Sequence, residues 1–210
     1  MKAILTLASC YLFAGMTAAI ADGPAKRPET WAKPMKLEGV PNFNQVSPML
    51  YRSAQPDATG MRNLKGKGIA TVVNLRSFHS DREEIGNTKL GHEHIFMKAW
   101  HPEREDVVKF LKIVTDPKRA PVLVHCQQGS DRTGLMCAIY RIVVQGWTRK
   151  EALREMTGGG FGFHAVWQDL PEWIENMDVE SLRKDAGIAE AGKVAQAAQL
   201  TKPPAAAATP

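Results

Sequence analysis

The sequence predicts an α/β domain in which helices flank a central, mainly parallel sheet. Residues 69–75 and 121–125 are short runs of β-branched and other apolar residues, a pattern typical of strands buried on both faces. Segments with apolar residues at helical spacing lie between and after these runs, and such alternation favours parallel pairing of the strands. The length of 210 residues suits one domain of this kind.

Each element has its own support in the sequence. Asp57 offers a helix cap and Gly66 a helix end. Thr148 and Glu151 have the spacing of a capping box, and the glycines at 158–160 end the helix that this box begins. In chain order we expect a strand at 49–52, a helix at 57–65, strands at 69–75 and 94–98, a helix at 103–115, a strand at 121–125, and helices at 132–145, 148–156 and 164–177.

The first residues of the chain have the pattern of an export signal. Residues 1–21 join a basic start to an apolar run that closes on Ala19-Ile20-Ala21, the pattern of a cleaved secretory signal peptide. The run is shorter than the roughly 20 apolar residues of a membrane-spanning helix. We therefore expect secretion across the inner membrane into a bacterial periplasm, with no stable membrane span once the signal is removed.

Cys10 offers a second interpretation of this leader. Residues 7–10 resemble a bacterial lipoprotein box, in which Cys10 would be acylated, but the apolar run continues well past it and favours cleavage after Ala21. Behind the leader we expect an extended lead-in over 22–45, a folded catalytic domain over 46–178, and an Ala- and Pro-rich tail over 179–210 that is partly disordered, with a frayed helix at 179–200.

The composition argues against several classes of protein. The net charge of +5 comes without the dense Lys and Arg stripes of nucleic-acid binders, so no nucleic-acid partner is expected. Three cysteines with no C-x-x-C pair exclude a disulfide-stapled mini-protein and a cysteine-rich zinc module. No histidine pair has H-E-x-x-H spacing, so we expect scattered or hydrogen-bonded histidines and no metal or other cofactor. These histidines are His79, His92, His94, His101 and His164.

One segment carries the chemistry. An apolar strand runs into His125-Cys126-Gln127-Gln128-Gly129-Ser130-Asp131-Arg132-Thr133-Gly134, after which a helix begins. A tight loop between a strand and a helix points backbone N–H groups inward, and the helix N-terminus adds positive potential. Such a cradle suits a dianionic phosphoryl group. Its glycine permits backbone angles that a side chain would obstruct.

The side chains of this segment suit distinct roles. Arg132 supplies a planar fork for two phosphoryl oxygens. The positive field favours the thiolate form of Cys126, which is then a nucleophile near neutral pH. His125 is expected to orient the backbone around the thiolate, and Thr133 to hydrogen-bond the sulfur. The substrate-binding residues are then Gln127, Gln128, Gly129, Ser130, Asp131 and Arg132. Cys137 lies in an apolar helix and is expected to be a core residue.

The segment resembles the signature H-C-x5-R-S/T of the cysteine-dependent protein tyrosine and dual-specificity phosphatases, which residues 125–133 match in full. Residues 50–56 and 71–76 also look like the bacterial, dual-specificity-like branch, and the resemblance covers about residues 48–177. It implies a tyrosine-phosphatase-like fold and a two-step mechanism through a phosphocysteine. It also implies that no metal takes part and that an acid protonates the leaving oxygen.

The acid is where this sequence departs from the family. Trp100-His101-Pro102-Glu103 is similar to the family's Trp-Pro-Asp loop, but no Asp stands at the expected place. Glu103 is the first candidate for the catalytic acid, with His101 and Asp106 as alternatives. The acidic members of this set could instead favour the N-terminus of the following helix.

The loop composition also bears on the substrate. The five residues between Cys126 and Arg132 hold no cation and one carboxylate, which disfavours a polyanionic ligand. We expect hydrolysis of a phosphotyrosine-like phosphoprotein or a small phosphomonoester. An inositol-phosphate or lipid-phosphate substrate is the alternative within the same chemistry, with Lys89, Lys98 or Arg104 supplying charge from outside the loop. A sulfurtransferase and a phosphate-binding pseudophosphatase are the alternatives outside it.

Overall fold

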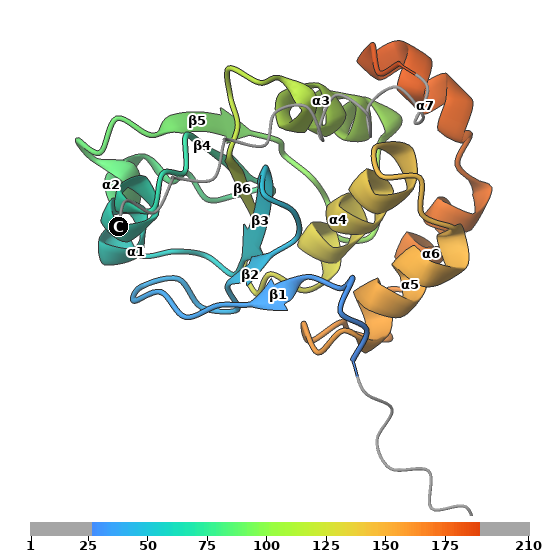
Figure 1. The fold of residues 1–210 in the computed structure, drawn as a ribbon, viewed down its shortest axis with the longest axis horizontal. Coiled ribbons are helices and arrows are strands. Elements are labelled where there is room, and N and C mark those ends of the chain that lie inside the picture. Colours follow the sequence, from blue (N-terminus) through green and yellow to red (C-terminus); the bar gives the residue numbers. More distant parts are fainter. Residues whose placement is uncertain (1–26, 190–210) are drawn as a thin grey trace, which may run out of the picture.

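The computed structural model describes residues 27–189, which fold around a six-stranded sheet of order β1-β2-β3-β6-β4-β5 (Figure 1). The strands are β1 (Lys33–Pro34), β2 (Asn44–Gln45), β3 (Leu50–Ser53), β4 (Thr71–Asn74), β5 (Gly91–His94) and β6 (Val122–His125). Strands β3, β6, β4 and β5 are parallel neighbours, while β1 and β2 add an antiparallel edge to β3. The predicted α/β class with a mainly parallel sheet is confirmed.

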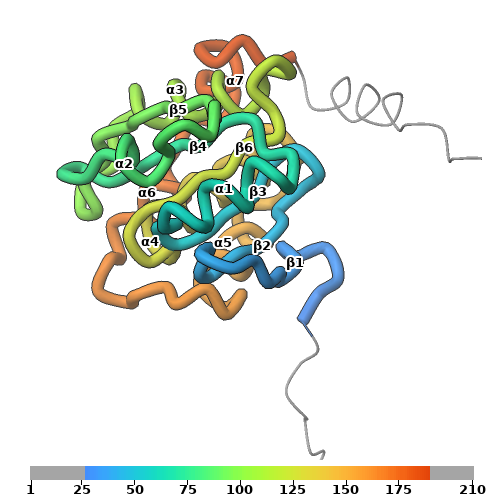
Figure 2. The backbone as a smooth tube through the Cα atoms, turned by 90° about the vertical axis from the view of Figure 1, so that its left-hand side faces the viewer, coloured from blue at the N-terminus to red at the C-terminus, as the bar shows by residue number. Residues whose placement is uncertain are grey.

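Helices cover both faces of the sheet. They are α1 (Ala58–Gly66), α2 (Arg82–Ile85), α3 (Arg104–Thr115), α4 (Asp131–Val143), α5 (Arg149–Gly158), α6 (Asp169–Asn176) and α7 (Val179–Ala186). Figure 1 shows α1 and α2 on one side and α3 to α7 on the other, and Figure 2 shows α1 in front of the strands. Alternate strand residues feed two cores: Val72 and Leu123 pack toward α1, whereas Val73 and Val124 pack toward the larger helical layer.

The predicted caps are present. The Asp57 carboxylate accepts the Gly60 N–H at 2.8 Å at the start of α1. Thr148 and Glu151 form the reciprocal capping box that begins α5. The apolar runs predicted as buried strands contain β4 and β6, and the two capped stretches form α1 and α5, as the sequence predicts.

Two predicted elements have the wrong bounds, and three observed elements have no predicted counterpart. The strand predicted at 94–98 is instead β5, which ends at His94 because its partner β4 ends at Asn74. Ile95 and Met97 are buried without being in a strand, so their apolar character misplaced the prediction. Helix α2 and the edge strands β1 and β2 have no predicted counterpart. The helix predicted from 164 begins at Asp169, because the preceding residues form a turn against the loop that follows β6.

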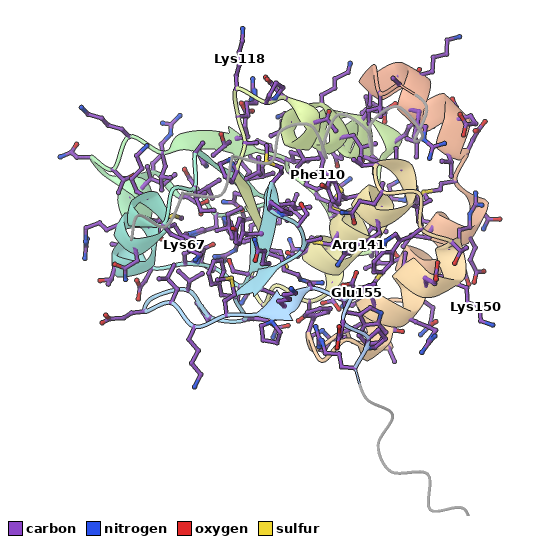
Figure 3. All side chains as sticks on the ribbon, viewed as in Figure 1. Lys67, Phe110, Lys118, Arg141, Lys150 and Glu155 are labelled. Atoms are coloured by element: carbon purple, nitrogen blue, oxygen red, sulfur yellow. The ribbon has the colours of Figure 1, made fainter. Side chains whose placement is uncertain are left out.

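The predicted lead-in packs onto the domain. Ala32, in the lead-in, is buried, and its N–H donates to the carboxylate of Glu155. Arg141 donates to the same carboxylate at 2.7 Å and to the carbonyl of Val46 at 3.0 Å. Figure 3 labels this buried pair where α4 and α5 meet the N-terminal strands. Residues 27–45 are therefore part of the domain.

The start of the predicted tail is also part of the domain. Helix α7 starts where the predicted frayed helix starts and ends at Ala186, and its Leu182 is fully buried in the larger core. The predicted signal peptide, Cys10 and residues 190–210 lie outside the described residues. Across residues 27–189, no helix is both long and apolar enough to cross a membrane.

Candidate active site

The loop between β6 and α4 has the tight geometry that its sequence predicts. Gly129 has a φ of +71°, and a Cβ at this position would come within 2.5 Å of the Ser53 backbone. Only glycine fits, because both the angle and the close approach exclude a side chain. Ser130 Oγ donates to the carbonyl of Phe161 at 2.8 Å, which fixes the far end of the loop.

A pocket of about 370 Å³ opens over this loop. Its lining consists of Ala99, Cys126, Gln127, Gln128, Asp131, Arg132, His164, Val166 and Trp167. The structure thus brings Cys126 and Arg132 to one cavity. Of the predicted substrate-binding residues, Gly129 and Ser130 are absent from this lining, because Gly129 packs against the backbone of Ser53 and the Ser130 hydroxyl donates to Phe161.

Arg52 supports the loop from beneath. Its guanidinium is fully buried, donates to the carbonyl of Gly129 at 2.7 Å, and lies 3.7 Å from the centre of the Phe161 ring. A planar cation can stack on an aromatic ring and donate a hydrogen bond at the same time. Arg76 makes no such contact and donates to Gln55 Oε1 at 3.0 Å. The sequence alone does not distinguish these two arginines.

His125 is held by a carboxylate that sequence reasoning missed. Its Nε2 lies 2.7 Å from Asp81 Oδ2, and its Nδ1 lies 3.2 Å from the carbonyl of Cys126. Asp81 also accepts hydrogen bonds from Gln55 at 2.9 Å and Asn74 at 3.0 Å. The ring of His125 is therefore fixed between the loop backbone and a buried anion, and its orienting role stays a prediction.

The environment of Asp81 favours its ionised form. Burial disfavours the charge, but the hydrogen bond and charge of His125, together with the Gln55 amide, outweigh it and hold the pKa of Asp81 below its ordinary value. Asp81 precedes His125 by 44 positions. No local motif marks it, so only the fold reveals the contact.

Two further predictions concern Cys137 and Thr133, which both lie in α4. Cys126 and Cys137 are both free thiols, and burial raises the pKa of Cys137 to about 11, so it stays a protonated core residue. Thr133 is fully buried, and its hydroxyl finds no hydrogen-bond partner within residues 27–189. That hydroxyl is therefore available for the sulfur or for a bound phosphoryl group.

The three candidate acids are Glu103, His101 and Asp106. None of them lines the pocket over Cys126 in the part of the chain that the structure describes, although nearby Ala99 does. Glu103 precedes α3 and is half-exposed, with one oxygen 3.8 Å from Lys98 Nζ. His101 is exposed. Asp106 is partly buried, and this burial, with the nearby charge of Glu103, raises its pKa.

His164 lines the pocket, although the sequence gives it no predicted role in the site. Its Nδ1 lies 2.9 Å from Asp131 Oδ2, and its backbone N–H donates to Asp131 Oδ1 at 2.9 Å. Asp131 thus ties the turn before α6 to the loop after β6. The glycine-rich stretch before His164 is the only sequence signal for this approach, and it indicates a turn rather than a partner.

These features define a class of protein. A model of the family described as "DSP-PTPase phosphatase fused to NAD+ Kinase" matches residues 36–169. The chain belongs to this DSP-PTPase family and is a cysteine-based phosphatase.

Particular relatives agree with this class. The dual specificity protein phosphatase TpbA of Pseudomonas aeruginosa is 35% identical over 167 residues, 78% of this chain and 74% of the relative. A crystal structure of a TpbA variant in complex with pTyr has a TM-score of 0.68 at 34% identity, covering 77% of this chain and 98% of that one. Inositol diphosphatase DSP3 of Arabidopsis thaliana is 30% identical over 151 residues, 68% of this chain and 73% of the relative.

Proposed function

We propose that this phosphatase hydrolyses monoesters of phosphotyrosine-like groups rather than polyphosphorylated inositols. The lining of the pocket over Cys126 carries the proposal. It offers one guanidinium, from Arg132, beside the carboxylate of Asp131, and its outer wall is apolar at Ala99, Val166 and Trp167. A single guanidinium can donate two hydrogen bonds to one phosphoryl group, and an apolar wall can pack against an aryl ring.

The cations outside the loop do not alter this balance. Lys98 lies beside Glu103, and Arg104 donates to Asp185 at 2.7 Å, so each is partly neutralised by a carboxylate. Lys89 is not among the lining residues of the described pocket. The complex of the TpbA relative with pTyr supports an aryl phosphate as the substrate. Because the DSP3 relative is an inositol diphosphatase, an inositol diphosphate is the second candidate substrate.

The chemistry runs in two displacements at phosphorus. The Cys126 thiolate attacks phosphorus, a sulfur–phosphorus bond forms, and the bond to the ester oxygen breaks. Arg132 and the loop N–H groups stabilise the charge on the non-bridging oxygens throughout. Water then attacks the phosphocysteine and releases phosphate and the thiolate, with Thr133 placed to hydrogen-bond the departing sulfur. No step needs a metal ion.

The leaving oxygen must gain a proton in the first displacement, and the pocket favours His164 as its source. With Nδ1 donating to Asp131, the imidazolium form of His164 carries its second proton on Nε2. That nitrogen has no hydrogen-bond partner within the described chain, and the side chain is 45% exposed. Glu103 remains the sequence-based candidate, and it requires movement of its loop toward the pocket.

Export is the remaining part of the proposal. The basic start, apolar run and small-residue closure of residues 1–21 support cleavage after Ala21 and a periplasmic location. Fractionation of bacterial cells expressing the chain, with the mature N-terminus sequenced, tests this directly. A mature protein that begins at acylated Cys10, or an uncleaved cytosolic one, would contradict it.

A substrate panel tests the specificity. We expect kcat/KM for a phosphotyrosine peptide to exceed that for an inositol pyrophosphate by about tenfold or more, because each extra phosphate meets no added cation in the pocket. The reverse order would favour the inositol phosphatase. Thiosulfate turnover without ester hydrolysis would indicate a sulfurtransferase, and vanadate binding without any turnover a pseudophosphatase.

A further inference from the structure

A second cluster of chemically active side chains lies behind the loop, around the start of α2. His79 Nε2 is 3.1 Å from Glu84 Oε1 and 3.8 Å from Asp81 Oδ1. Asp81 Oδ2 is in turn 3.9 Å from Nε2 of His92, on β5. One ligand atom from each of His79, Asp81 and Glu84 lies within 4.8 Å of the others.

Three atoms of this cluster are buried without hydrogen bonds. They are His79 Nε2, His92 Nε2 and Glu84 Oε2, and none has a hydrogen-bond partner within the described residues. Buried polar atoms are normally paired, so three such atoms gathered around one carboxylate call for an explanation. Each can offer a lone pair to a cation, which would satisfy all of them together.

We propose that His79, Asp81, Glu84 and His92 form a binding site for one divalent transition-metal ion, with Zn²⁺ as the fitting ion. Zn²⁺ takes histidine nitrogens and carboxylate oxygens at about 2.0–2.2 Å in a tetrahedron, which places neighbouring ligand atoms about 3.4 Å apart. The 3.1 Å between His79 Nε2 and Glu84 Oε1 and the 3.9 Å between His92 Nε2 and Asp81 Oδ2 bracket that distance. The 3.8 Å from His79 Nε2 is to Oδ1, the other oxygen of Asp81. Two imidazoles with two carboxylates favour Zn²⁺ over Mg²⁺ or Ca²⁺, which prefer oxygen ligands throughout.

The site is coupled to the catalytic loop through Asp81. The same carboxylate lies 2.7 Å from Nε2 of His125, the residue before Cys126. Oδ1 of Asp81 already accepts hydrogen bonds from Gln55 and Asn74, whereas Oδ2 accepts only the one from His125. Because an oxygen of this kind has two lone pairs, Oδ2 can bind a metal and still accept the hydrogen bond from His125. The ion takes no part in phosphoryl transfer. It adds a link between β5, α2 and the loop, and it stabilises the folded state by mass action.

Zinc titration tests the site in a Cys126→Ser background, which prevents the catalytic thiolate from binding metal. We expect calorimetry of the metal-stripped protein in a non-chelating reductant to give one Zn²⁺ per chain, with a rise in Tm. Adding Glu84→Gln should weaken binding by about tenfold or more. Adding Glu83→Gln, the exposed neighbour on α2, should leave it unchanged.

Cobalt provides a second readout. Co²⁺ bound by a four-ligand nitrogen and oxygen site should give visible d–d absorption in the Cys126→Ser protein, and His79→Gln in that background should abolish it. Circular dichroism of the metal-free variants separates loss of the site from loss of the fold. The proposal is overturned if the Cys126→Ser protein shows no saturable binding, or if Glu83→Gln weakens binding as much as Glu84→Gln. In that case His79 and Glu84 form only an ion pair.

Discussion

Asp81 Oδ2 lies 2.7 Å from Nε2 of His125, and both side chains are fully removed from solvent. This contact joins the loop before α2 to the residue that precedes the catalytic cysteine. Gln55 reinforces it, because its amide donates to Asp81 while its backbone N–H donates to the carbonyl of Gln127 at 3.1 Å. The segment that carries Cys126 is thus supported by residues from two other parts of the chain, around Gln55 and around Asp81.

Removing the Asp81 carboxylate should destabilise the fold and the loop together. Asp81→Ala leaves His125 and two amides facing a buried gap, and breaking a buried pair of this kind costs about 3–5 kcal/mol. Urea unfolding should show this loss, and kcat should fall in the folded fraction. Ser80→Ala, at the exposed neighbouring position, serves as the control. Equal stability of the two variants would contradict a structural role for the contact.

The same contact predicts a pH dependence of stability. The folded pKa of Asp81 is below its ordinary value of 3.8, so its stabilisation is fully present above that value. It is lost as the pH falls through the lower folded pKa. In metal-stripped protein, the stability difference between the wild type and Asp81→Asn should therefore narrow only below about pH 4. A difference that narrows instead between pH 6 and 8 would show that another group controls the contact.

Arg52→Lys should damage the loop although the charge is kept. Lysine cannot both stack on Phe161 and donate to Gly129 with one planar group. We expect a stability loss of about 1.5–3 kcal/mol, the range for a hydrogen bond to a charged group. A loop displacement of about 1 Å could lower activity by up to about 100-fold. Arg62→Lys, on the exposed face of α1, is the matched control and should behave as wild type.

The proton donor can be identified by varying the leaving group. If His164 is the acid, His164→Gln should lower kcat by about 10²–10⁴-fold for a phenyl or alkyl phosphate. The loss should be small for p-nitrophenyl phosphate, whose leaving group needs no proton. Glu103→Gln should retain near-normal rates with both substrates. A leaving-group dependence that appears with Glu103→Gln instead would assign the acid to Glu103.

The part of the site that lies in one segment of the chain could be predicted from the sequence. The residues that contact this segment from elsewhere in the chain could not. Residues 125–133 carry strand, loop and helix start in one segment, so Cys126, Arg132 and Gly129 are recognisable without the fold. Asp81 and His164 are single polar residues far along the chain from their partners. Their contacts depend on the packing of α2 and of the turn before α6, which no short pattern specifies.

The segment boundaries show the same limit. The lead-in has little apolar periodicity, yet Val40 and Phe43 are buried because β1 and β2 extend the edge of the sheet. Apolar residues at 95 and 97 indicate burial correctly but not strand pairing, which the length of β4 determines. The positions of apolar residues in the sequence therefore predict which residues are buried better than they predict which strands pair.

The central claim is that Cys126 forms a phosphocysteine without help from a metal, and rapid-mixing kinetics test it most directly. Purified, reduced wild type and Cys126→Ser would each be mixed with p-nitrophenyl phosphate in the presence of EDTA, at low pH and low temperature to slow hydrolysis of the intermediate. We predict a burst of p-nitrophenol that approaches one equivalent of wild-type enzyme, followed by steady turnover, with both absent in Cys126→Ser. Turnover that survives the substitution, or folded and reduced wild type that releases no p-nitrophenol, would contradict the account.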